Sequence, residues 1–156
     1  MAYAFSFAAR YQDMEVQTAD PLGLVVLLYQ GAVRQLRRAE QALEANQTDV
    51  RVDAINRALA IIGELQASLD HQRGGEIARS LDRLYTYMTR QLTTANLRRS
   101  RRELSEVRSL LETLLSAWEE AHAKQEASAK TSQPTLGSLP DQVSFQNRPV
   151  PPATLG

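Results

Sequence analysis

The chain has 156 residues, with eighteen basic and eighteen acidic side chains and no cysteine. The balanced charge gives no sign of a nucleic-acid or membrane surface, and the lack of cysteine excludes a disulfide framework or a thiolate metal site. No apolar run approaches the roughly 20 residues that a membrane-spanning helix needs. We therefore expect a soluble, cytoplasmic protein that neither binds nucleic acid nor inserts into a membrane.

Proline divides the chain into regions of different character. No proline interrupts the chain between Pro21 and Pro134, and the remaining prolines lie from Pro134 onwards. This distribution is typical of long helices followed by a different kind of chain. We predict an N-terminal segment over residues 1–19, a helical domain over 20–124, and a disordered tail rich in Ser, Thr, Gln and Pro over 125–156.

The first eleven residues carry an unusual concentration of aromatic side chains. Tyr3, Phe5, Phe7 and Tyr11 all lie there, although a chain end is usually poorly ordered. Two interpretations stay open. The segment either packs as a short cap over the end of the helical domain, or it is a detachable apolar segment that covers a binding groove until a partner displaces it.

The first predicted helix begins at Asp20 and Pro21. Aspartate is a preferred N-cap residue and proline suits the first helical position, and the apolar pattern continues to about Asn46. The first two turns are apolar nearly all round, which is typical of a helix buried on several sides. The main apolar stripe consists of Val25, Leu28, Tyr29, Ala32, Leu36, Ala39 and Leu43.

Three further helices follow at short intervals. The second starts after Asp49 and ends at the Gly74–Gly75 pair, because glycine ends a helix at little cost. The third runs from Gly74 to Asn96, and residues 100–103 match a capping box that starts the fourth. Connections of about two to six residues favour antiparallel neighbours. We therefore predict an all-α protein: an antiparallel up-and-down four-helix bundle with an N-terminal capping segment and a disordered C-terminal tail.

Side chains suited to catalysis or metal binding are few. The two histidines are His71, in a turn, and His122, near the end of the fourth helix. Glu119 and His122 match the Glu-x-x-His pattern of carboxylate-bridged metal bundles, but those bundles need a second copy, which His71 does not supply. We predict no catalytic, cofactor-binding or metal-binding residues, and no enzymatic activity. A metal-binding helical bundle stays open as an alternative.

Apolar residues exceed what a four-helix core needs. A bundle requires about three apolar positions in seven, and the first two helices carry further apolar strips beside their main stripes. These strips fit a generously packed core, a homodimer interface, or a groove that accepts an amphipathic helix from a partner. The predicted partner-binding residues are Tyr11, Met14, Leu22, Val26, Tyr29, Val33, Ala54, Ala58, Ile61, Leu65 and Tyr87.

Short motifs follow one another in a distinctive order between Tyr11 and Glu120. They are Tyr11-Gln12, Thr18-Ala19-Asp20-Pro21, Leu27-Leu28-Tyr29-Gln30-Gly31-Ala32, Leu69-Asp70, Gly74-Gly75-Glu76-Ile77-Ala78, Leu84-Tyr85, Tyr87-Met88, Ala95-Asn96 and Trp118. In order and spacing this combination resembles the flagellin-specific export chaperone family, FliS. The sequence departs from that pattern at Gly23, where glutamate is common, at Gln30, where an acidic residue is common, and at Ser80, where asparagine is common.

The resemblance implies a cytoplasmic helical chaperone that binds the C-terminal segment of flagellin. It further implies that the chain prevents premature polymerisation of flagellin and delivers it to a component of the flagellar type III export gate. We expect a monomer or a weak homodimer, and we expect the segment from Tyr3 to Met14 to occupy part of the groove when no partner is bound. A self-assembling helical structural protein is the competing interpretation.

Overall fold

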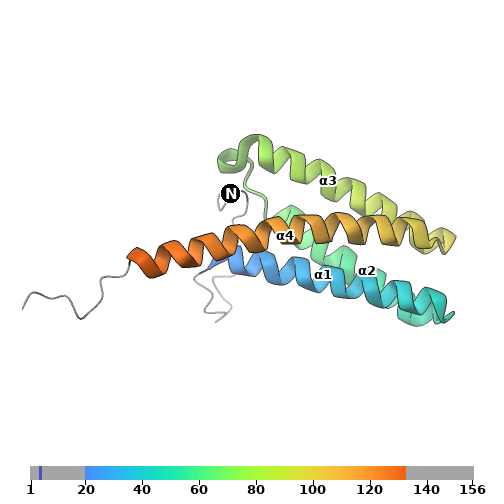
Figure 1. The fold of residues 1–156 in the computed structure, drawn as a ribbon. Coiled ribbons are helices and arrows are strands. Elements are labelled where there is room, and N and C mark those ends of the chain that lie inside the picture. Colours follow the sequence, from blue (N-terminus) through green and yellow to red (C-terminus); the bar gives the residue numbers. More distant parts are fainter. Residues whose placement is uncertain (1–3, 5–19, 133–156) are drawn as a thin grey trace, which may run out of the picture. The chain divides into compact units, whose positions relative to one another are not determined.

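The computed structural model of this chain describes Ala4 and residues 20–132, which form a bundle of four α-helices (Figure 1). The predicted antiparallel four-helix bundle is confirmed. The predictions made for residues 1–3, for residues 5–19 and for the chain beyond Ser132 lie outside the described residues. The helices are α1 (Pro21–Glu44), α2 (Thr48–Ala67), α3 (His71–Arg98) and α4 (Arg101–Ser132).

Helix α1 begins as its capping residues predict. Asp20 has an extended backbone, and its Oδ1 accepts a hydrogen bond from the Gly23 amide at 3.1 Å. Pro21 occupies the first helical position, where its missing N–H costs nothing. This cap fixes the first residue of α1.

Small residues allow α1 and α2 to pack closely together. Gly31, Ala32 and Ala39 are buried on α1, and Ala54 and Ala58 are buried on α2. A Cβ atom added at Gly31 would lie 3.4 Å from a terminal methyl carbon of Ile61, so a side chain of α2 already reaches the backbone of α1. The interface is therefore tight and leaves little room for larger side chains.

The core lies between the four helices and follows the predicted stripes. Two buried tyrosines stand at its centre, one on α1 and one on α3, and leucine, isoleucine, methionine and valine fill the layers around them. The largest fully buried side chains are Tyr29, Tyr85, Leu36, Ile55, Ile62, Leu65, Met88, Leu92, Leu104, Leu111, Val25 and Val107.

The start of α3 differs from the prediction. The sequence analysis ended the second helix at Gly74–Gly75, whereas α2 ends at Ala67 and α3 begins at His71. Asp70 provides the reason, because its side chain accepts a hydrogen bond from the Arg73 amide at 3.0 Å and caps the new helix. Gly75 interrupts that helix with φ +50° and ψ −125°, a conformation that glycine adopts at little cost. The glycine pair therefore marks a kink within α3.

The chain divides into two units, residues 1–124 and residues 125–156. In the second unit, the described residues are the last turns of α4, which continue to Ser132, and residues 125–131 are exposed. This helix is longer than the sequence analysis predicted. The stretch AKQEASAK is rich in good helix formers, which explains why the helical backbone continues without burying an apolar face.

Candidate partner-docking surface

Most of the predicted partner-binding residues lie inside the bundle. Ile61 is partly buried and Tyr87 is exposed, whereas Tyr11 and Met14 lie outside the described residues. A docking role for the buried residues stays a prediction, because in the described conformation their side chains already contact neighbouring helices. The buried members of the set are Leu22, Val26, Tyr29, Val33, Ala54, Ala58 and Leu65.

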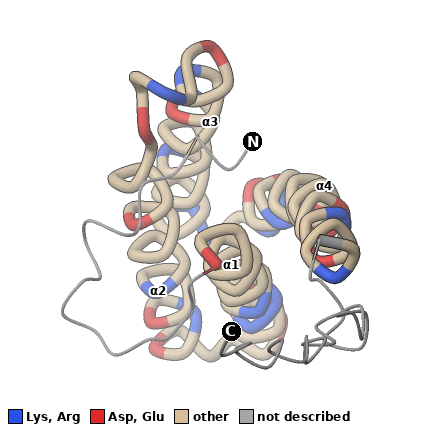
Figure 2. The backbone as a smooth tube through the Cα atoms, turned by 90° about the vertical axis from the view of Figure 1, so that its left-hand side faces the viewer, with Lys and Arg blue, Asp and Glu red and all other residues tan. Residues whose placement is uncertain are grey.

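The strips beside the main stripes are buried because α1 has a neighbour on each flank. Val26 and Val33 lie one turn from Gln30 and Arg37, whose side chains bond to Glu119 and Glu112 of α4 at 3.4 and 2.7 Å. On the other flank α1 meets α2. Figure 2 shows α1 between α2 and α4. The extra apolar residues of α1 and α2 therefore fill two helix interfaces.

Two exposed apolar side chains lie instead where α3 faces α4. Ile77 and Tyr87 are 48% and 42% exposed, and Leu84, which shares their side of α3, is only partly buried. The hydroxyl of Tyr87 bonds to Glu106 of α4, so this side of α3 looks toward α4. On α4, Leu110 and Leu114 follow Glu106 at helical spacing and are also partly buried. We call Ile77, Leu84, Tyr87, Leu110 and Leu114 the α3–α4 face.

The two helices that form this face are close at one end only. Figure 1 shows α3 and α4 meeting near the turn at Arg99 and Ser100 and separating toward the start of α3. Ile77 lies near the separated end, which explains its exposure. The α3–α4 face therefore has a narrow end, where Tyr87 contacts Glu106, and a wide end, where Ile77 lies.

One described residue of the N-terminal segment lies at the wide end. Ala4 is buried within the hydrophobic core, and its carbonyl oxygen accepts a hydrogen bond of 2.6 Å from the amide of Asp70, the residue that caps α3. This contact joins a residue near the chain terminus to the start of α3. Ala4 therefore lies at the same end of the bundle at which the α3–α4 face opens.

Three buried aromatic side chains, those of Tyr29, Tyr85 and Trp118, form a cluster in the core. The hydroxyls of Tyr29 and Tyr85 lie 2.5 Å apart and share a hydrogen bond, and the ring of Trp118 packs 6.3 Å from that of Tyr29. Burial raises the pKa of both tyrosines, so both hydroxyls stay protonated. The group joins α1, α3 and α4 and has a structural role.

Polar pairs connect α1 to α4 along most of their shared length. Glu40 accepts a hydrogen bond from Arg108 at 2.6 Å, and Arg108 also bonds to Glu112 at 3.1 Å. The hydrogen bond that Arg108 donates to Glu40 raises the pKa of Arg108, and the hydrogen bond from Arg37 lowers the pKa of Glu112. This network fixes the register of α4 on α1.

The last of these pairs joins Asp20 to His122. The Nε2 atom of His122 lies 2.5 Å from Oδ2 of Asp20, across 102 positions of sequence. Burial raises the pKa of Asp20, but hydrogen bonds from the Gly23 amide and from His122 outweigh it and hold that pKa below its usual value. The carboxylate form of Asp20 is therefore favoured, and it serves as both a helix cap and a contact to α4.

The Glu-x-x-His pattern of the sequence does not act as one unit. Glu119 accepts its hydrogen bond from Gln30, whereas His122 contacts Asp20. His71, the other histidine, is exposed at the start of α3. The two halves of the pattern are thus engaged with different residues of α1.

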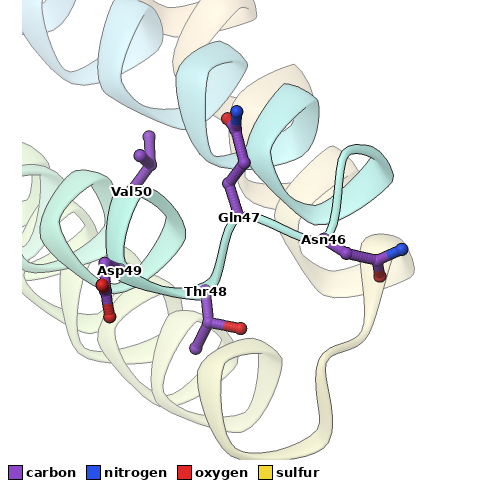
Figure 3. Close-up of a pocket in the computed structure, with 5 residues that line it drawn as sticks. All are labelled: Asn46, Gln47, Thr48, Asp49 and Val50. Atoms are coloured by element: carbon purple, nitrogen blue, oxygen red, sulfur yellow. The ribbon is translucent and has the colours of Figure 1, made fainter.

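A shallow pocket in the turn between α1 and α2 offers no better candidate. It is lined by Asn46, Gln47, Thr48, Asp49 and Val50 (Figure 3). Figure 3 shows Gln47 and Val50 pointing to one side of the backbone and Thr48 and Asp49 to the other. Side chains that diverge in this way do not converge on a ligand. The α3–α4 face is therefore the candidate functional surface.

Comparison with known proteins identifies the family. The family model for the flagellar protein FliS matches residues 4–125. The chain is 38% identical over 121 residues to the flagellar secretion chaperone FliSB of Pseudomonas aeruginosa, which covers 75% of this chain and 96% of that protein. It is 39% identical over 113 residues to the flagellar secretion chaperone FliS of Salmonella typhimurium, covering 72% of this chain and 84% of that protein. The chain belongs to the FliS family.

Solved structures support the fold of this FliS family member. A crystal structure of a flagellar chaperone from bacteria matches 74% of this chain and 94% of that chain, with a TM-score of 0.64 and 19% identity. Relatives of this chain in the FliS family are named flagellar secretion chaperones. None of the described helices combines the length and the apolar character needed to cross a membrane.

Most of the α3–α4 face is not predicted from the sequence. Ile77, Leu84, Leu110 and Leu114 all recur at helical spacing with apolar residues of their own helices, which does not mark them as exposed. Periodicity identifies an apolar side of a helix but not how far away the neighbouring helix lies. Tyr87 was found because it falls outside the main stripe of α3. The exposure of the others depends on the divergence of two helices.

Proposed function

We propose that this FliS family member binds the C-terminal segment of flagellin in the cytoplasm, prevents its premature polymerisation and assists its delivery to the flagellar type III export gate. The α3–α4 face is the observation that supports this proposal most directly. An export chaperone must offer apolar surface to a poorly folded segment, because the entropy lost when that segment is ordered has to be offset. Membership of the FliS family, whose relatives are named flagellar secretion chaperones, supports flagellin as the partner.

The face suits an amphipathic helix better than a small ligand. Its apolar members extend along α3 from Ile77 to Tyr87, a distance of about 15 Å at 1.5 Å per residue. A helix placed over them would present apolar side chains every third or fourth residue. At the narrow end, Tyr87 and Gln91 both contact Glu106, so a hydrogen-bonded boundary closes the apolar strip.

Calorimetric titration tests the proposal. The full chain is titrated with a peptide that covers the last forty or so residues of the organism's flagellin. We expect saturable one-to-one binding with a negative heat-capacity change, because apolar surface is buried. Absence of binding to a folded, monomeric chain would contradict the proposal. Stable self-association without peptide, measured by sedimentation, would instead favour the self-assembling structural protein.

We also propose that the N-terminal segment competes for the same surface. The contact between Ala4 and Asp70 supports this, since it holds Ala4 at the wide end of the α3–α4 face. Removing residues 1–14 should therefore increase the affinity for the peptide or its rate of association. Unchanged affinity and unchanged association rate would show that the segment is only a cap.

A further inference from the structure

The contact between His122 and Asp20 replaces a local feature of helix capping. In a capping box, a glutamate or glutamine at the third helical position reaches back to the N-cap residue. The third position of α1 is Gly23, which has no side chain to do so. His122 approaches the cap from α4 instead, and its Nε2 lies 2.5 Å from the Asp20 carboxylate.

Gly23 leaves the space that this approach requires. A Cβ atom at position 23 would lie 3.0 Å from Oδ2 of Asp20 and 3.2 Å from Nε2 of His122. Both distances are tighter than ordinary van der Waals contacts, so any larger residue would press on the pair. Asp20, Gly23 and His122 therefore form one structural unit, which we call the cap contact.

The cap contact lies where α4 is least secured by its core. In the first half of α4, Leu104, Val107 and Leu111 are fully buried. In the following turns, Leu114 and Ala121 are only partly buried, although Trp118 is enclosed. Fewer apolar contacts therefore hold this part of the helix, and its hydrogen bonds to α1 matter more for its position.

The same part of α4 carries one wall of the α3–α4 face. Leu114 belongs to that face and lies two turns before His122, within the unit formed by residues 1–124. A movement of these turns away from α1 would change the separation between Leu114 and Ile77 of α3. The position of the face is thus linked to the contact between α4 and α1.

We propose that His122 is a positioning residue for partner docking: through Asp20 it fixes the second half of α4 on α1 and so sets the width of the α3–α4 face. The proposal rests on the proposed function, but its structural part can be measured without a partner. His122 contacts no reacting group and need not touch the partner. Its effect on binding is transmitted by the placement of α4.

Hydrogen exchange of the unliganded chain tests the structural part. His122→Ala should accelerate amide exchange over residues 113–124 and in the first turn of α1, and leave exchange near Leu104 unchanged. His122→Gln should restore protection, since its amide N–H can reach the Asp20 carboxylate. Arg101→Ala is the matched control, because it removes an ion pair with Glu44 at the opposite end of the same two helices.

Peptide binding tests the functional part. With the flagellin peptide as probe, His122→Ala should weaken binding by about threefold to tenfold, because a preorganised surface is lost. His122→Gln and Arg101→Ala should bind as the unaltered chain does.

Two outcomes would overturn the positioning role. Either His122→Ala leaves amide exchange over residues 113–124 unchanged, or it accelerates that exchange without changing the affinity for the peptide. If the unaltered chain does not bind the peptide, the proposed function and the docking role of His122 both fail, while the exchange data still report on the contact.

A double substitution shows whether Gly23 and His122 act together. Alanine normally raises the melting temperature when it replaces a helical glycine. Gly23→Ala alone should bring little of that gain, because the new methyl group presses on the cap contact. When His122→Ala is also present, Gly23→Ala should raise the melting temperature by the full amount expected for a helical glycine. If Gly23→Ala changes the melting temperature equally with and without His122→Ala, Gly23 does not make room for His122.

Discussion

The two flanks of α1 are built on different principles. Toward α2, small buried residues such as Ala32 and Ala54 bring the backbones close together, and an ion pair between Arg38 and Asp53 lies at the exposed rim. Toward α4, pairs such as Glu40 with Arg108 and Asp20 with His122 connect the helices along their length. Close packing of small side chains holds α1 against α2, whereas specific hydrogen bonds and ion pairs contribute much of the contact between α1 and α4.

This difference indicates which helix can change position. A close-packed apolar interface loses many van der Waals contacts at once when it opens, so partly separated positions of the two helices are unfavourable. Polar pairs at a partly exposed interface can exchange with water one at a time. We therefore expect α1 and α2 to remain a rigid pair, and we expect the second half of α4 to be the adjustable element of the bundle.

The largest effect is expected from a larger side chain between α1 and α2. Ala54→Leu should lower the free energy of unfolding by about 2–3 kcal/mol, because the close-packed site cannot accept the added volume without moving the helices. Chemical denaturation measures this change. Ala60→Leu, at an exposed position of the same helix, is the control and should shift stability little. A loss below about 0.5 kcal/mol for Ala54→Leu would mean that the interface is less tightly packed than described.

A smaller effect is expected from breaking the polar network between α1 and α4. Glu40 is 8% exposed and bonds to Arg108, so Glu40→Ala should cost about 1–2 kcal/mol by leaving a partly buried guanidinium with one partner fewer. Glu44→Ala, at an exposed pair with Arg101, should cost less than about 0.5 kcal/mol. Equal costs for the two variants would remove the distinction between buried and exposed pairs.

The smallest effect concerns the acid response of Asp20. Its pKa is lowered in the folded chain, so its contribution to stability is present above the unfolded pKa of about 4 and is lost as the pH falls through the folded value. Asn also caps helices, so Asp20→Asn should keep the cap but lose this dependence. When thermal unfolding is measured from pH 6 to pH 2.5, the melting temperatures of the unaltered chain and of Asp20→Asn should therefore converge as the pH falls. Parallel plots of melting temperature against pH would contradict the lowered pKa of Asp20 in the folded chain.

The bundle could be predicted from sequence because its determinants are local. Apolar residues at helical spacing identified the helices, and Asp20 with Pro21 identified the start of α1. The start of α3 was wrong, because Gly74–Gly75 was interpreted as a helix end while the capping ability of Asp70 was overlooked. Two local signals competed there, and the cap prevailed over the glycine pair.

The candidate surface could not be predicted in the same way, because it depends on how helices are placed relative to one another. Val26 and Ala58 lie beside the main stripes of their helices, but both are buried because each flank meets another helix. Ile77 recurs with the core residues of α3, yet it is exposed where α3 and α4 separate. The cap contact joins residues 102 positions apart, and no local pattern pairs Asp20 with His122.

The most direct test of the account compares two substitutions on α3. Ile77→Asp places a charge on the α3–α4 face, whereas Leu97→Asp places one at a side chain that is 81% exposed and outside the face. Calorimetric titration with the flagellin peptide should show affinity reduced at least tenfold by Ile77→Asp, about 1.4 kcal/mol or more, and unchanged by Leu97→Asp, with both variants folded. Full binding by the Ile77 variant would show that flagellin docks elsewhere on the bundle.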